Sequence, residues 1–264
     1  MGNKDGIRTF FRLKNRSKKV SICRVSDLIK HRFNLDNLAN EFVRIDREVW
    51  AVVTQDSRFS KTKDIAESHF KICPQIIYCA FKDGKLVATL TNMFTTEVEL
   101  AKNKTWTEKT GGGYLTTHLP SGDVGFGVDL AVTREAPKNV SDKLVLSTVL
   151  IGIIGEGLKS GYIGSRIPSY HKHKDMKVKD YVYGKRKNGK PLDPELYFYM
   201  KDGFKIVEII PEYMDDPDSL NYGVLIKWDN PLYKVTKTLP FLKPIIRWVG
   251  KKLFLRIPKQ IDSG

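Results

Sequence analysis

The chain alternates apolar and polar residues with two different periods, and each period predicts one type of element. Residues 20–24 alternate singly, which predicts a short strand. Residues 26–50 carry apolar side chains at helical spacing, and Asn34 or Asp36 can stop and restart that helix. Residues 62–71 predict a further short helix. The first quarter of the chain is therefore expected to form one strand followed by helices.

Two β-rich runs, residues 75–81 and 85–94, flank the tripeptide Lys82-Asp83-Gly84. An Asp-Gly pair between apolar runs favours a tight turn, because both residues tolerate a positive φ. These residues therefore predict a β-hairpin.

A polar stretch follows at residues 95–121 and contains Gly111-Gly112-Gly113. This composition predicts a loop. Trp106, Tyr114 and His118 are unusual in a linker, so the loop is expected to line a cleft.

The second half of the chain alternates strands and helices without an internal repeat. The predicted elements are strand 124–133, helix 139–160, strand 162–167, helix 194–202, and strands 203–210 and 222–229. Asn139 or Ser141 can cap the long helix, and Gly161 is expected to end it. This order predicts an α/β (α+β) domain.

An amphipathic helix is predicted over residues 239–257. Its apolar residues recur at steps of three and four, at Leu242, Ile245, Ile246, Val249, Leu253 and Ile257. Its basic and aromatic positions are Lys243, Arg247, Trp248, Lys251, Lys252, Phe254 and Arg256. Two interpretations fit: an interfacial helix on an anionic membrane surface, which we favour, or a helix that docks on its own domain or on a second copy.

The composition narrows the class of protein. The chain has 264 residues and is 41% hydrophobic, which suffices for a large core. Its three cysteines form no pairing framework, which favours a reducing, cytoplasmic compartment. No apolar run approaches the 20 or so residues that span a bilayer.

The net charge of +15 lies entirely at the two ends of the chain. Residues 1–32 hold ten Lys/Arg and two Asp, and residues 234–264 hold eight and one. The remaining residues carry 27 charges of each sign. Basic ends on a neutral body suit an anionic membrane, a nucleic acid or an acidic carrier protein, although they can also serve solubility alone.

Residues 164–231 carry several motifs in a fixed order. Gly-Ser-Arg-Ile-Pro-Ser-Tyr-His-Lys begins at Gly164, and Asp-Pro-Glu-Leu begins at Asp193. Tyr199 lies four residues before Gly203-Phe204. This order resembles the C-terminal half of the GNAT acyltransferase superfamily, and in particular the acetyltransferase-like domain fused to nitrilase-type amidohydrolases.

The resemblance implies a GNAT fold over residues 20–231, with a mixed central sheet whose fourth and fifth strands run parallel and splay apart. A basic N-terminal extension, 1–19, and a basic amphipathic C-terminal segment, 232–264, flank this domain. The implied activity is transfer of an acyl group, acetyl or longer, from acyl-coenzyme A to the primary amine of a small molecule or lipid precursor.

The resemblance also implies where the donor binds, along Leu130 and Val132 and at the start of the helix after them. GNAT enzymes hold the donor pyrophosphate on a glycine-containing loop at that helix N-terminus, where backbone amides favour an anion. Here Pro137, Lys138 and Asp142 stand where Arg, Gly and Gly are expected. Lys138, Ser141 and Lys143 can meet the phosphates as side chains, whereas Asp142 would repel them.

Two residues are candidates for acid–base catalysis. Tyr199 occupies the position of the GNAT tyrosine that protonates the leaving thiolate, for which a phenol is a suitable acid. The alternative is an aromatic ring that only fills space. Asp129 occupies the position of a general base or water relay, and burial would suit it to that role. The alternative is a structural pair with Arg166 on the adjacent strand.

Three further residues are candidates for substrate binding. Arg166, Tyr170 and His171 follow the fifth predicted strand, and a guanidinium there can hold an acceptor carboxylate or a donor phosphate. The histidines beside Lys172 lack companion ligands at metal spacing, so no metal is predicted. Residues 172–190 are basic and polar and predict a mobile flap.

Two other functions remain open. An acidic acyl carrier protein can deliver the acyl group in place of coenzyme A, since basic ends would attract it. Alternatively, the fold binds a membrane or nucleic acid without catalysis. Nucleic acid is the weaker partner because the ends hold few aromatic residues for base stacking. Either way we expect a cytoplasmic protein, peripheral on the inner face of the membrane if it binds lipid.

Overall fold

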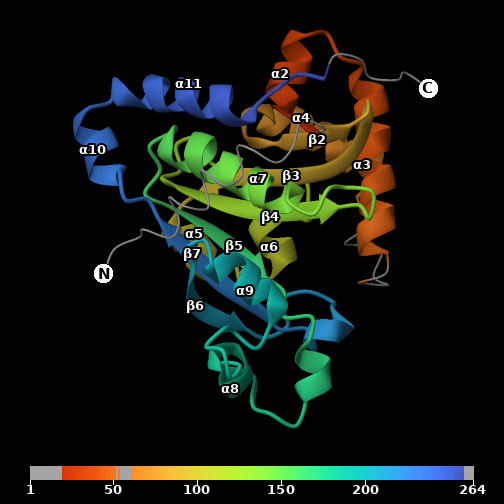
Figure 1. Ribbon diagram of the computed structural model, residues 1–264, viewed down its shortest axis with the longest axis vertical. Helices are drawn as coiled ribbons and strands as arrows, with labels where there is room; N and C mark the ends of the chain where they lie inside the picture. Colours follow the sequence, from red (N-terminus) through yellow and green to blue (C-terminus); the bar gives the residue numbers. More distant parts are fainter. Residues whose placement is uncertain (1–19, 52, 54–60, 259–264) are drawn as a thin grey trace.

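A computed structural model describes residues 20–51, 53 and 61–258 (Figure 1). Seven strands form one sheet in the order β1-β2-β3-β4-β5-β7-β6. The strands are β1 (Val20–Arg24), β2 (Tyr78–Lys82), β3 (Lys85–Thr95), β4 (Val124–Val132), β5 (Ser160–Ser165), β6 (Lys205–Ile210) and β7 (Gly223–Asp229). Neighbouring strands are antiparallel except β4 and β5, which are parallel.

Helices connect the strands and cover the sheet. The α-helices are α2 (Val25–Lys30), α3 (Leu35–Trp50), α4 (Lys63–Ile72), α5 (Glu97–Lys102), α6 (Trp106–Thr110), α7 (Val140–Ser147), α8 (Val178–Tyr183), α9 (Pro194–Met200), α10 (Tyr233–Thr238) and α11 (Leu242–Phe254). Short 3-10 helices are η2 (Pro74–Ile76), η4 (Tyr170–His173) and η5 (Pro217–Ser219). The segment η3 (Thr148–Ile154) continues α7 as a π-helix.

The helix stop at Asn34 and the β-hairpin predicted in the first hundred residues are confirmed. Asn34 separates α2 from α3, and its side chain accepts hydrogen bonds from the amides of Asp36 and Asn37. The β2–β3 hairpin turns at Asp83 and Gly84, whose φ angles are 50° and 84°. These elements follow from local sequence because a cap and a positive-φ turn need no distant partner.

The predicted loop 95–121 is partly helical. Thr96 caps α5 by accepting from the amide of Glu99, and Thr105 forms a capping box with Glu108 at the start of α6. Both short helices begin at a threonine that accepts hydrogen bonds from otherwise unpaired amides. The loop prediction rested on the polar composition and did not consider these caps.

The central helix is shorter than predicted. It ends with η3 at Ile154, and Gly157 with a φ of 73° begins the turn that follows, whereas Gly161 lies inside β5. Asn139 is at the N-cap, but its side chain makes no capping hydrogen bond. The first amides of α7 are therefore not capped by the residue predicted to do so.

Successive strand residues point to opposite faces of the sheet, and each face has its own helical layer. Cys79 and Phe81 of β2 pack with Phe42 of α3. Tyr78 and Ala80, one residue before each, pack with Leu144 of α7. The sheet therefore lies between α3 and α4 on one side and α7 with η3 on the other.

The parallel strands β4 and β5 diverge, as the fold prediction requires. They pair from Val124 with Ser160 to Gly127 with Ile163, and β4 then continues to Val132 paired with β3 alone in the described part of the sheet. The β3–β4 register shifts between Gly127 and Asp129, so Val128 forms a β-bulge. The divergence and the bulge together open the middle of the sheet.

The insert 172–190 is anchored rather than free. It contains α8, whose Tyr181 is fully buried and donates its hydroxyl hydrogen bond to Asp193, 3.0 Å away. Tyr181 also stacks on Tyr170 with ring centroids 5.0 Å apart. The prediction of a mobile polar flap rested on the many lysines of this insert and left out the buried Tyr181.

The C-terminal helix α11 docks against the central helix (Figure 1). A Cβ on Gly250 would lie 2.7 Å from Ile151, which shows how closely the two helices approach. Arg247 forms an ion pair with Glu156 at 2.8 Å, and Leu255 bridges to Ile22 of β1. Arg247 was predicted to face lipid head groups, and in the structure it pairs with the domain instead. Among the described residues, no helix is long and apolar enough to cross a membrane.

Candidate active site

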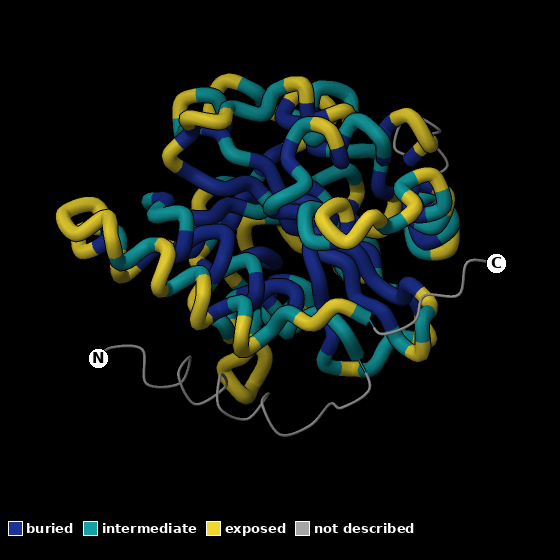
Figure 2. The backbone as a smooth tube through the Cα atoms, turned by 90° about the horizontal axis from the view of Figure 1, so that it is seen from above, coloured by how far each residue is buried: buried dark blue, intermediate teal, exposed yellow. Residues whose placement is uncertain are grey.

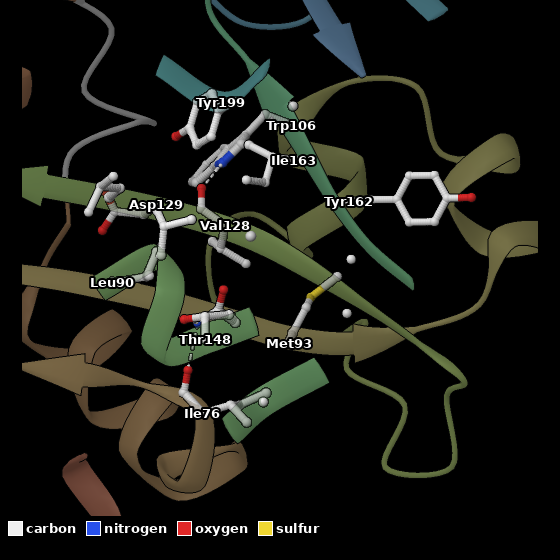
Figure 3. Close-up of a pocket in the computed structure, with 18 of the residues that line it drawn as sticks. Ile76, Leu90, Met93, Trp106, Val128, Asp129, Thr148, Tyr162, Ile163 and Tyr199 are labelled. Carbon is white, nitrogen blue, oxygen red and sulfur yellow. Dashed lines mark hydrogen bonds between the residues drawn. The ribbon is translucent and has the colours of Figure 1, made fainter. Parts of the chain in front are cut away.

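A cavity lies where β4 and β5 separate (Figure 3). With its open mouth included, the empty space is ≈ 1370 Å³. Its lining comes from both faces of the sheet, with Trp50 and His69 from one helical layer and Thr148 and Tyr199 from the other. The cavity therefore passes through the sheet rather than lying on one side of it.

Glycines in the two diverging strands keep this passage open. Gly125, Gly127, Gly161 and Gly164 all line it. A Cβ on Gly125 would lie 2.6 Å from Cδ1 of Ile153, and one on Gly161 would lie 3.2 Å from the same atom. Side chains at these strand positions would compete with the π-helix for the same space.

Trp106 closes one wall of the cavity at the bulge. Its indole Nε1 donates a hydrogen bond of 2.9 Å to the carbonyl of Val128 (Figure 3). The prediction that the 95–121 stretch lines a cleft holds for Trp106 and for Gly112 and Gly113. Tyr114 and His118 instead bond elsewhere, Tyr114 to Asp64 and His118 to the amide of Phe94.

Tyr199 projects from α9 into the cavity (Figure 3). Its ring packs against Phe198 and Phe204, while none of the described residues forms a hydrogen bond with its hydroxyl. Burial raises its pKa well above the usual range, and the nearby carboxylates Glu195 and Asp129 raise it further. The phenol therefore stays protonated at neutral pH and is available as a hydrogen-bond donor.

Glu195 lies one helical turn before Tyr199 and lines the same cavity. Burial raises the pKa of its carboxyl to about 7, although Arg166 counteracts this. Glu195 was not among the residues predicted for the site. The signal was present, since residues four apart on a helix share one face.

Asp129 is held by partners that the sequence did not reveal. Its Oδ1 accepts a hydrogen bond of 2.9 Å from the indole of Trp50, and its Oδ2 lies 2.6 Å from Nζ of Lys61. The alternative interpretation, in which Asp129 pairs with Arg166, is wrong because Arg166 binds Asp216. Both carboxylate oxygens are engaged by groups from the α3 side of the sheet, which a strand pattern cannot indicate.

Arg166 lines the cavity, but its guanidinium is already committed. It binds Asp216 in a bidentate pair of 2.7 and 2.8 Å and lies 5.7 Å above the ring of Trp50. Tyr170 and His171 lie outside the lining of the cavity. The Tyr170 hydroxyl donates to the carbonyl of Met176, and Nδ1 of His171 lies 3.0 Å from the carbonyl of Pro168.

His69 contributes a buried imidazole to the cavity. Its Nε2 lies 2.6 Å from the carbonyl of Gly113, which requires a proton on Nε2, and Nδ1 has no partner among the described residues. Burial lowers its pKa to about 3, and the charge of Lys61 lowers it further. A neutral imidazole therefore presents one hydrogen-bond acceptor near the passage.

Two proteins of Bacillus subtilis are similar to this chain in sequence. The chain is 29% identical over 174 residues to "Uncharacterized N-acetyltransferase YkwB" of Bacillus subtilis, a match covering 66% of this chain and 76% of that protein. It is 28% identical over 208 residues to "Probable hydrolase YhcX" of the same organism, covering 71% of this chain and 38% of that protein. No family model matches.

Two solved structures share the arrangement of the whole domain. The loading GNATL domain of CurA from Lyngbya majuscula aligns with a TM-score of 0.65 at 18% identity, covering 80% of this chain and 97% of that one. The GphF GNAT-like decarboxylase in complex with isobutyryl-CoA aligns with a TM-score of 0.61 at 20% identity, covering 80% and 98%. The chain has the GNAT fold.

The partial match to YhcX fits the fused-domain resemblance. The match covers about two fifths of that longer protein, whose name is that of a probable hydrolase, so a segment similar to this chain occurs within it. The parallel, splayed β4–β5 pair and the C-terminal helix agree with the expected GNAT architecture.

A thioester donor is predicted to lie along β4, and the residues there are compatible with one. Leu130 lines the cavity, and the stretch from Val128 to Val132 is unpaired on the side of β5. Backbone groups of an unpaired strand edge can bind an extended chain such as the donor arm. The predicted contacts of Leu130 and Val132 stay predictions that this geometry supports.

The start of α7 also suits an anion, despite its lack of glycines. The amides of Ser141 and Asp142 donate to no described protein group. Asp142 forms an ion pair with Lys201 at the end of α9, so its carboxylate charge is neutralised. Lys138 is exposed, and burial lowers the pKa of Lys143, with Arg256 nearby adding to this. Basic groups therefore surround unpaired amides, the setting that favours phosphate.

Within the part of the chain that the structure describes, no three His, Cys, Asp or Glu side chains lie close enough to hold an ion. Cys23, Cys73 and Cys79 are all buried and free.

The Lys61–Asp129 pair should matter for stability. Both side chains are nearly buried, so Lys61→Met leaves a charged carboxylate without its ammonium partner. We expect the free energy of unfolding to fall by about 3 kcal/mol or more, measured by urea denaturation.

Lys63→Met is the matched control for this change. Lys63 pairs with Asp36 on the surface, where ion pairs contribute little. Equal losses in the two variants would show that the buried pair has no special role in stability.

Proposed function

We propose that the protein transfers an acyl group from acyl-coenzyme A to a primary amine. The observation that supports this most strongly is the cavity through the sheet at the β4–β5 divergence, with Tyr199 and Glu195 one helical turn apart on its wall. A passage open to both faces lets a donor and an acceptor approach from opposite sides. An acid and a base at their meeting point are what acyl transfer needs.

The proposed chemistry uses both side chains. The amine nitrogen of the acceptor attacks the thioester carbonyl carbon, and Glu195 accepts the proton that this nitrogen loses. The carbon–sulfur bond then breaks, and Tyr199 donates its proton to the departing thiolate. The products are an amide and free coenzyme A, with one proton moved from nitrogen to sulfur overall.

Glu195 is a better candidate for the base than Asp129. A carboxyl with a pKa of about 7 is half ionised at neutral pH, which balances availability against proton affinity. Asp129 has both oxygens occupied by Trp50 and Lys61. The prediction that Asp129 is a base or water relay stays a prediction. In the mechanism proposed here, its carboxylate instead holds Lys61 and Trp50 in position.

The lining of the cavity supports an acyl group longer than acetyl. Apolar side chains dominate its walls, among them Ile76, Leu90, Met93, Val149, Ile153 and Phe204. Burial of each methylene of an acyl chain against such walls is worth about 0.8 kcal/mol. We therefore expect affinity to increase with chain length over the first few methylenes.

Thermal shift tests donor binding directly. Coenzyme A, acetyl-coenzyme A and longer acyl-coenzyme A thioesters are each added to the full chain, and Tm is recorded. A ligand at a hundredfold excess over its Kd stabilises the folded state by about 2.7 kcal/mol, so a clear rise in Tm is expected. No rise with any thioester would favour the non-catalytic binding protein.

Turnover is then measured as release of free thiol with a panel of amines, and the products are identified by mass spectrometry. Formation of the acyl amide supports the proposal. Transfer only from a thioester on an acyl carrier protein would identify that protein as the donor. Loss of carbon dioxide from a carboxylated acyl thioester, without amide formation, would replace acyl transfer with the reaction named for GphF.

A further inference from the structure

The C-terminal helices concentrate the exposed apolar surface of the protein. Among the described residues, nine of the sixteen exposed large apolar side chains lie between positions 232 and 257. They are Leu232, Val235, Leu239, Phe241, Ile245, Trp248, Val249, Leu253 and Ile257. Phe241 and Trp248 are the most exposed of these, at 63% and 61%. Such a concentration on one segment marks an interaction surface.

Five of these side chains lie on one side of α11 and its N-cap residue, Phe241. Phe241, Ile245, Trp248, Val249 and Leu253 follow helical spacing, so they share one side. The opposite side carries Ile246 and Gly250, which pack on the protein body. Figure 2 shows α10 and α11 along one edge of the molecule, with exposed residues on their outer side. We call this outer side the α11 outer face.

The charged residues of the C-terminal segment all have one sign. Residues 231–258 contain seven Lys/Arg and no Asp or Glu. Lys252 lies on this face, with Nζ 6.0 Å from the ring of Trp248. Lys234, Lys237 and Arg256 are also exposed. An apolar stripe on a segment whose charged residues are all cations is complementary to a surface of acyl chains beneath anionic head groups.

We propose that the α11 outer face binds the surface of an anionic lipid bilayer. Trp248 and its apolar neighbours would lie at the boundary of the acyl chains, with Lys252 and Arg256 near the head groups. A second copy of this chain is a poorer occupant, because it would bring two cationic segments together. Membrane binding is independent of catalysis and extends the proposed function.

The structure changes the expected role of two basic residues of this helix. Arg247 and Lys243 were expected to contact head groups, but Arg247 pairs with Glu156, and the Lys243 stem lies against Gly157. These two cations therefore attach the helix to the domain. The lipid contact consequently rests on Lys252 and Arg256 rather than on every basic residue of the helix.

Vesicle co-sedimentation of the full chain tests the proposal. Vesicles of phosphatidylcholine mixed with phosphatidylserine are compared with vesicles of phosphatidylcholine alone, at low and high salt. We expect binding to the mixed vesicles that weakens with salt. The double variants Ile245→Ser/Trp248→Ser and Lys252→Glu/Arg256→Glu should each reduce the partition coefficient about tenfold or more.

Matched controls separate this face from general surface properties. Val98→Ser and Val207→Ser remove exposed apolar side chains from α5 and β6, and Lys172→Glu/Lys174→Glu reverses charges in the insert. All control variants should bind the mixed vesicles like the original chain. Tm identifies any variant that fails to fold, and the remaining double variant then decides the result.

Several outcomes would overturn the proposal. Unchanged sedimentation of both α11 double variants would exclude this face. Binding that is independent of phosphatidylserine and salt would exclude the electrostatic contact. A dimer seen by light scattering that Ile245→Ser/Trp248→Ser dissolves, without vesicle binding by the original chain, would assign the face to a second copy.

Discussion

Tyr199→Phe should lower turnover by about ten- to a thousandfold while leaving the affinity for acyl-coenzyme A nearly unchanged. The ring packs between Phe198 and Phe204, and phenylalanine preserves these contacts. Only the hydroxyl group is lost. In the original chain, burial raises the pKa of Tyr199 and so keeps the proton on this hydroxyl at neutral pH. Steady-state kinetics and donor titration measure the two quantities separately.

Tyr197→Phe is the control for this prediction. Tyr197 lies on the same helix, two residues earlier, outside the lining of the cavity, with Nζ of Lys190 over its ring at 4.7 Å. Its loss should leave turnover unchanged. If Tyr199→Phe is as active as the original chain, Tyr199 only fills space, and the leaving thiolate takes its proton from another source.

Glu195→Gln should have the second large effect, which depends on pH. Below its pKa of about 7 the Glu195 carboxyl is protonated and cannot accept a proton from the amine. We therefore expect kcat/KM of the original chain to rise as pH increases toward 7 and the rise to become less steep above it. Glutamine removes the base, and kcat/KM at neutral pH should fall about a hundredfold.

The shape of the two pH profiles identifies the group. The acceptor amine titrates equally in both proteins, so the ratio of their kcat/KM values isolates Glu195. That ratio should increase up to pH about 7 and then remain constant. A constant ratio at every pH would mean that Glu195 acts only by shape. If Asp129→Asn, rather than Glu195→Gln, removes the pH dependence, the base is Asp129, as the sequence first suggested.

Local sequence determined most of the elements and their order. The Asn34 cap, the Asp83-Gly84 turn and the helix that carries Tyr199 were all predictable, because each depends on neighbours a few residues away. The motif order from Gly164 onward, together with Tyr199, led to the GNAT fold, which the comparison with solved structures confirms. The spacing of Glu195 and Tyr199 was equally readable in the sequence.

The partners of the charged residues were decided by tertiary structure. Asp129 binds Lys61, 68 residues away, and Trp50, 79 residues away, across a face that the strand pattern leaves unspecified. Arg166 was expected beside Asp129 and instead binds Asp216. An ion pair forms with whichever opposite charge the fold brings near, and that depends on how helices pack on the sheet rather than on spacing along the chain.

In the C-terminal helix, the contributions of local sequence and of tertiary structure are easiest to separate. Its periodicity and composition were sufficient to predict an amphipathic helix, but they could not determine which side faces the protein. Gly250 allows close approach to Ile151, and Glu156 attracts Arg247, so the side containing these residues docks. Trp248 and Ile245 consequently point outward. Sequence thus determines which residues share a helix face, while the surface available for packing determines which face is buried.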